Sequence, residues 1–212
     1  SRIKQGYHAD AVSDFTQAIN ARDFGHHKLI QDADKNDFNE YFRALSIAVN
    51  RSDNFDILNT ALNKDDHIFY TYWLASRISL PEKQYDKAVN LLDRFIESSN
   101  SDPAIADAKL QQLAIYRLAN KKDQHKSLLA TIYDQYGPQS EFYKNHQKHE
   151  NINNLMESLR HHMLILAENQ HDEFLKSRSI DFYTEADRWY KRYLDNFGSF
   201  ANQDKVYRAY AE

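Results

Sequence analysis

Ten histidines are the side chains of this 212-residue chain best suited to chemistry, because an imidazole can ligate a metal or carry a proton. In the stretch HQKHE, His146, His149 and Glu150 fall at i, i+3 and i+4, which would place two nitrogen ligands and one oxygen ligand on one helical face. No third histidine has a matching spacing, and HExxH does not occur. We expect a solvated helix end here, with a zinc site as the alternative.

Two further groups of ionisable residues are weaker candidates. His161 and His162 are adjacent and diverge by about 100° on a helix, so we expect one to face a groove while the other packs or is solvated. The pair Asp65–Asp66 resembles a helix cap, and Asp172–Glu173 falls in a polar stretch that we interpret as a link. Without a phosphate-binding loop, a GxSxG motif or a cysteine, the sequence predicts no enzyme, no cofactor and no metal.

Composition narrows the class of protein further. A hydrophobic content of 42% is enough for a folded core, and a net charge of −4 gives no excess of cations to neutralise nucleic acid. The longest apolar run, residues 163–167, is far shorter than the roughly 20 residues of a membrane span. Four glycines and three prolines are too few for many tight turns, which favours long helices joined by short breaks.

The elements that must position any site are therefore helices. Apolar residues recur with a period near 3.6 in nearly every stretch, and no stretch alternates long enough for a confident strand. We predict an all-α fold of roughly ten helices. The clearest ones cover residues 11–19, 38–49, 67–80, 85–96, 104–119, 123–136, 151–169, 183–197 and 206–211.

Three segments share one pattern of small, aromatic and bulky positions. They are HADAVSDFTQAI, YDKAVNLLDRFI and YTEADRWYKRYL, with the small residue at Ala11, Ala88 and Ala186. A small residue lets the preceding helix approach closely, and the aromatic one turn later fills the space beside it. In the last segment we expect Tyr183 and Tyr190 on this packing face, whereas packing does not require Trp189, which would contact a following helix or a partner.

This pattern resembles the second helix of the tetratricopeptide repeat. Residues 113–137 resemble a crossing from first to second helix, with Asn120 where glycine is usual and His125 or Lys126 where alanine is usual. The ending YGPQS is similar to the link between such repeats. The resemblance covers roughly two thirds of the chain, with insertions expected near 25–37 and 169–181 because the three alanines are not spaced by a multiple of about 34 residues.

The resemblance implies one α-α superhelix over 1–212 that binds a protein or peptide on its concave face, which first helices mainly build. The residues expected to line that face are Tyr70, Trp73, Arg77, Gln112, Tyr116, Arg117, Arg160 and His161.

The same pattern is similar to repeats of bacterial cell-envelope scaffolds, which favours the periplasm over the cytoplasm. Because the matches begin at a second helix and end at a first helix, we expect a segment of a longer array. The alternative function is self-assembly into homo-oligomers through exposed terminal helices.

Overall fold

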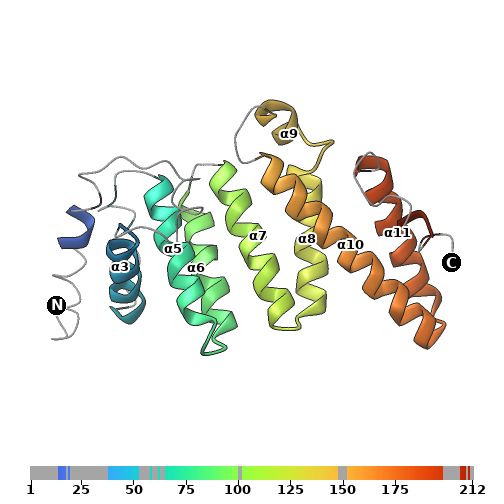
Figure 1. Ribbon diagram of the computed structural model, residues 1–212, viewed down its shortest axis with the longest axis horizontal. Helices are drawn as coiled ribbons and strands as arrows, with labels where there is room; N and C mark the ends of the chain where they lie inside the picture. Colours follow the sequence, from blue (N-terminus) through green and yellow to red (C-terminus); the bar gives the residue numbers. More distant parts are fainter. Residues whose placement is uncertain are drawn as a thin grey trace. The chain divides into compact units, whose positions relative to one another are not determined.

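Helices are the only regular elements in the described part of the computed structural model (Figure 1). The structure describes residues 14–17, 19, 38–52, 58, 62, 65–99, 102–147, 152–197, 206–208 and 210. The predicted all-α class is confirmed, and no strand occurs among these residues. None of the described helices combines the length and apolar character needed to cross a membrane.

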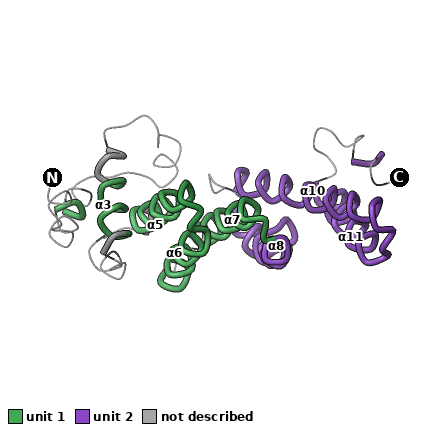
Figure 2. Tube along the Cα trace, turned by 90° about the horizontal axis from the view of Figure 1, so that it is seen from below, with its two compact units in different colours: residues 1–121 green, residues 122–212 purple. Residues whose placement is uncertain are grey.

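The chain divides into two compact units, residues 1–121 and residues 122–212 (Figure 2). Each is described by itself, and the single repeat domain expected over 1–212 stays a prediction. Of the segment HADAVSDFTQAI, residues 14–17 and 19 are described and helical, while Ala11 lies outside the described residues, as do Gly198 and the whole expected insertion at 25–37.

Unit 1 is a row of helices in which neighbours along the chain pack together. Its main elements are α3 (Phe38–Ser52), α5 (Asp65–Ser79), α6 (Tyr85–Ser98) and α7 (Asp102–Leu118). The ring of Phe42 meets Tyr70 edge to face at 4.9 Å, and Phe69 lies 5.2 Å from Phe95, so aromatic pairs join α3 to α5 and α5 to α6. Helix α7 packs on both α6 and α5. Ala88, the small residue of the second matching segment, is fully buried.

Helices α5 and α7 of this unit are each followed by a residue in the left-handed backbone region. Lys83 has φ 57° after α5, and Asn120 has φ 54° after α7. At the second end Asn120 N–H donates to Arg117 O at 3.1 Å and Lys121 N–H to Tyr116 O at 2.9 Å, which is a Schellman arrangement. Glycine has no Cβ to oppose this conformation, so Asn120 holds a turn position that glycine would also suit.

Unit 2 is built around one long helix. It contains α8 (Lys122–Tyr136), α9 (Glu141–His146), α10 (Ile152–Ser177) and α11 (Ile180–Phe197), and α10 packs on α8 and α11. The break after α8 falls in YGPQS as predicted. Gly137 is needed there because a Cβ would overlap the carbonyl oxygen of Tyr133.

Two features of unit 2 differ from the sequence prediction. The polar stretch ENQHDEFLKS, part of which was expected to be an insertion, continues α10 to Ser177 because Phe174 and His171 still pack against α11 residues. The short helix α9 was not predicted. It begins where Ser140 Oγ accepts the N–H of Tyr143 at 3.0 Å, a cap that satisfies one free donor of the first turn.

Candidate functional site

The predicted partner-binding residues of α5 form one contact chain, of which only the last member is exposed. Tyr70 is fully buried and its ring stacks on Trp73 with 5.5 Å between centroids. The guanidinium of Arg77 lies 4.7 Å from the centre of the Trp73 ring, a cation–π contact. Tyr70 and Trp73 therefore serve the core of unit 1, and Arg77 is the accessible residue of the three.

On α7 the predicted residues have different environments. Gln112 is 4% exposed, and its Nε2 donates to Asp93 Oδ1 at 2.7 Å, which fastens α7 to α6. Tyr116 is half-buried, and burial together with the nearby Asp93 carboxylate raises its pKa. Arg117 is exposed. The side-chain N–H group of Gln112 is thus hydrogen-bonded within unit 1. The binding role expected for the exposed residues stays a prediction.

The histidine pair of α10 divides as its spacing predicted. His161 is exposed, Arg160 before it is half-buried, and His162 is 7% exposed. Nδ1 of His162 lies 3.2 Å from Nε2 of His125 on α8, so one ring donates and the other accepts. The HQKHE stretch was the other candidate. His149 and Glu150 lie outside the described residues, and the described residues contain no cluster suited to a metal.

Two aromatic residues of the last matching segment differ sharply in their exposure. Trp189, which packing within the motif did not require, is fully buried and is the largest such side chain described. Tyr183, expected on the packing face, is 50% exposed. Arg188 and Arg192 of the same helix lie 5.5 and 5.2 Å from the centre of the Trp189 ring. Tyr183 lies 5.4 Å from Phe174 near the end of α10 and keeps half of its surface exposed.

The exposed Tyr183 belongs to a groove in unit 2, which we call the aromatic groove. It has a volume of about 250 Å³ and lies between the second half of α10, the first half of α11 and the segment near the C-terminus. Its walls are His171, Phe174, Tyr183, Ala186, Asp187, Tyr190 and Tyr210.

The groove is lined by one carboxylate, that of Asp187, in addition to its aromatic rings. Asp187 Oδ1 accepts the hydroxyl proton of Tyr210 at 2.8 Å, and its Oδ2 accepts from Lys191 Nζ at 2.9 Å. These two donors hold the pKa of Asp187 below its usual range, with the Lys191 bond the larger cause. The same bond to Asp187 raises the pKa of Tyr210. The Asp187 carboxylate is therefore ionised at neutral pH and paired with Lys191.

An apolar margin continues the groove along α11. Ile180, Tyr183 and Asp187 fall at i, i+3 and i+7, so they share one stripe of the helix. Ile180 is 68% exposed, and Leu175 near the end of α10 is 46% exposed. Both residues belong to the helices that line the groove, and exposed large apolar side chains are typical of interaction sites when they gather in one region.

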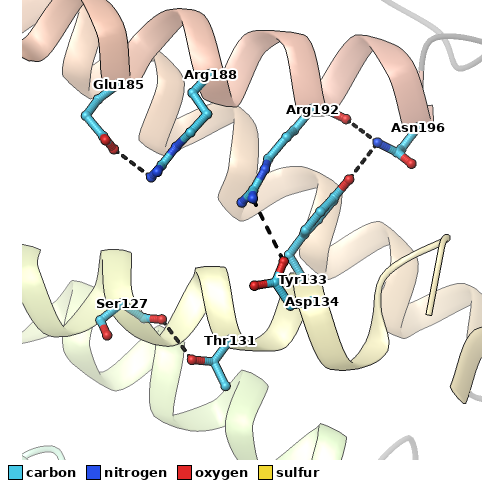
Figure 3. A network of polar contacts seen from close by, with 8 residues as sticks. All are labelled: Ser127, Thr131, Tyr133, Asp134, Glu185, Arg188, Arg192 and Asn196. Carbon is cyan, nitrogen blue, oxygen red and sulfur yellow. Dashed lines mark hydrogen bonds and ion pairs between the residues drawn. The ribbon is translucent and has the colours of Figure 1, made fainter. Parts of the chain in front are cut away.

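The face of α11 that contains Arg192 is polar and is joined to α8 by long side chains (Figure 3). Asn196 Nδ2 donates to the Tyr133 hydroxyl at 2.7 Å, and Glu185 accepts from Arg188 and pairs with Lys126, each at 2.8 Å. The guanidinium of Arg192 lies over the Tyr133 ring at 4.8 Å. Because these side chains pair α11 with α8, we interpret this face as a contact between the two helices.

Sequence reasoning missed the aromatic groove for an identifiable reason. His171 and Phe174 lie in the stretch that was expected to be partly an insertion, and Tyr210 comes from a segment distant along the chain. The sequence did contain a signal, because aromatic residues occur close together at Phe174, Phe182 and Tyr183. Aromatic residues of this kind were interpreted as core packing.

Comparisons with protein-family models, curated proteins and solved structures found no match to the chain.

Proposed function

We propose that this protein is a non-catalytic helical-repeat scaffold of the tetratricopeptide-like type, which binds a segment of a partner protein in the aromatic groove. The observation that carries the proposal is the open groove itself, with Tyr183 half exposed and Ile180 mostly exposed on the same stripe of α11. Aromatic anchors beside a hollow are the usual energetic centre of a protein interface.

The packing of the helices supports the repeat architecture. Within unit 1, α7 contacts both members of the preceding helix pair, and within unit 2, α10 contacts α8 as well as α11. This is the arrangement expected when each new helix covers the apolar face of the pair before it. The groove is formed by α10, α11 and the segment that follows them. It is therefore a different surface from the first-helix positions that the sequence indicated as the binding face.

A peptide selection tests the proposal directly. Peptides enriched from a random display library on the intact chain are labelled, and their Kd values are measured by fluorescence anisotropy. Tyr183→Ala and Ile180→Ser should weaken binding about tenfold or more, as expected for anchors worth over 1 kcal/mol. Leu118→Ser, which changes a 58% exposed side chain in unit 1, is the matched control.

Two results contradict the proposal. If no peptide is enriched on this chain above the background on an unrelated protein, the proposed scaffold function is wrong. If enriched peptides bind both groove variants and the control alike, the groove is not the site, and Arg77→Ala and Arg117→Ala then test the exposed positions of unit 1.

Self-assembly through terminal helices stays a separate prediction. Most of the residues near both ends lie outside the described residues. Light scattering across a range of protein concentrations tests it, since a constant monomer mass contradicts self-association.

A further inference from the structure

The aromatic groove combines several aromatic rings with one carboxylate, and this combination favours a particular kind of ligand. Five of its seven residues carry aromatic rings, and one carries a carboxylate. Phe174 and Tyr183 lie 5.4 Å apart, while Tyr190 lies 5.9 Å from Tyr210 and 6.1 Å from His171. Ring faces are electron-rich, so several rings around one anion favour a positively charged group.

Cations of the chain itself already occupy two of these walls. The guanidinium of Arg178 lies 5.7 Å from the centre of the Phe174 ring, and Lys191 donates to Asp187. The Lys191 side chain is 59% exposed, and Arg178 is also exposed. Surface pairs of this kind are worth little in water, so an incoming cation can replace them at small cost.

The Asp187 carboxylate remains able to accept an additional bond. Each of its oxygens carries one described hydrogen bond, and a carboxylate oxygen has two lone pairs. The Tyr210 hydroxyl fixes one oxygen from a different segment, which holds the carboxylate in place while Lys191 moves away. The volume of about 250 Å³ is slightly below that of sites for whole small molecules, and suits one side chain or head group.

We infer that the aromatic groove binds a cationic group, the guanidinium or ammonium of a basic side chain in the partner segment, between its rings and the Asp187 carboxylate. This inference rests on the proposed function, because it names the chemistry by which the scaffold recognises its partner. The exposed Ile180 and Leu175 would contact apolar residues flanking that basic side chain.

A pair of small probes tests the charge requirement without a known partner. Choline carries the cation, and 3,3-dimethylbutan-1-ol has the same shape without charge. Each is titrated at constant ionic strength into the intact chain with ¹³C-labelled tyrosine rings, and the NMR signals of Tyr183, Tyr190 and Tyr210 report occupancy. Choline should shift these signals saturably, and the neutral alcohol should bind at least about fivefold more weakly.

Two variants should move choline affinity in opposite directions. Asp187→Asn keeps an oxygen to accept from Tyr210 but removes the charge, and should weaken binding about fivefold. Lys191→Met removes the competing cation and should strengthen binding. Lys176→Met is the matched control, because it removes a 70% exposed lysine that pairs with Glu173 and not with Asp187.

The outcomes separate this inference from the proposed function. Absence of saturable choline shifts, equal affinity for the neutral alcohol, or unchanged affinity in Asp187→Asn each overturns the inference. If selected peptides still depend on Tyr183 in that case, the scaffold function stands and the groove recognises apolar residues alone.

Discussion

His125 on α8 and His162 on α10 meet inside unit 2, with 3.2 Å between Nε2 of the first ring and Nδ1 of the second. The residues are 6% and 7% exposed, so the bond is shielded from water. It requires one ring to donate and the other to accept. This hydrogen bond links α8 to α10 across 37 residues of sequence.

This bond should appear as an energetic coupling between the two residues. We expect His125→Leu, His162→Leu and the double variant to give a coupling free energy of about 0.5–1.5 kcal/mol in urea unfolding. The control cycle combines His125→Leu with His161→Leu at the exposed neighbour, and should be additive. Equal coupling in both cycles would contradict a specific bond.

The left-handed turn after α5 should be improved by glycine. Lys83 is exposed with φ 57°, a conformation that costs an ordinary residue about 1–2 kcal/mol. Glycine removes that cost but adds freedom to the unfolded chain, so Lys83→Gly should gain about 0.5–1 kcal/mol of unfolding free energy. Lys83→Ala retains the Cβ and should give no gain. If the two variants melt at the same temperature, strain at this turn is not significant.

The turn between α8 and α9 should not tolerate a side chain at Gly137. A Cβ there overlaps the backbone carbonyl oxygen of Tyr133, so the end of α8 must shift. Gly137→Ala should lower the free energy of unfolding by about 1–3 kcal/mol, the usual cost of overpacking. Circular dichroism during urea unfolding measures it, with Asn145→Ala on the exposed side of α9 as control. Wild-type stability in Gly137→Ala would disprove this account of the turn.

Burial of the Tyr133 hydroxyl, which accepts a hydrogen bond from Asn196, should make the stability of the fold fall at alkaline pH. Tyr133→Phe loses the hydroxyl acceptor and should cost about 0.5–1.5 kcal/mol at pH 7. Burial raises the pKa of Tyr133 above its ordinary value of 10.0, so its neutral form stabilises the fold below that pH. This contribution disappears as pH rises through the higher folded pKa.

The difference between wild type and Tyr133→Phe should therefore shrink above pH 10. Urea unfolding at pH 7, 9 and 10.5 measures it. Tyr207→Phe, at a 51% exposed site, is the control and should show no such trend. A constant difference across this range would contradict the role of burial.

Local pattern was enough to predict most helices, because a helix buries one stripe and the apolar residues must follow its period. Ala88, Ala186 and Tyr190 are buried as their spacing indicated, and the chain turns at Asn120 and Gly137. The end of α10 was missed because its polar residues carry no strong stripe of their own. Its helical form is accompanied by contacts of Phe174 and His171 with α11.

The sequence by itself determined an all-helical chain, the sites of its main breaks and the separate directions of His161 and His162, since these depend on residues close together along the chain. Tertiary structure alone decided that Trp189 is fully buried while Tyr183, on the same helix, remains half exposed. It also decided that Asp187 meets Tyr210 across a hollow of aromatic rings. Exposure depends on what other segments cover a side chain, and a helical period cannot specify that neighbour.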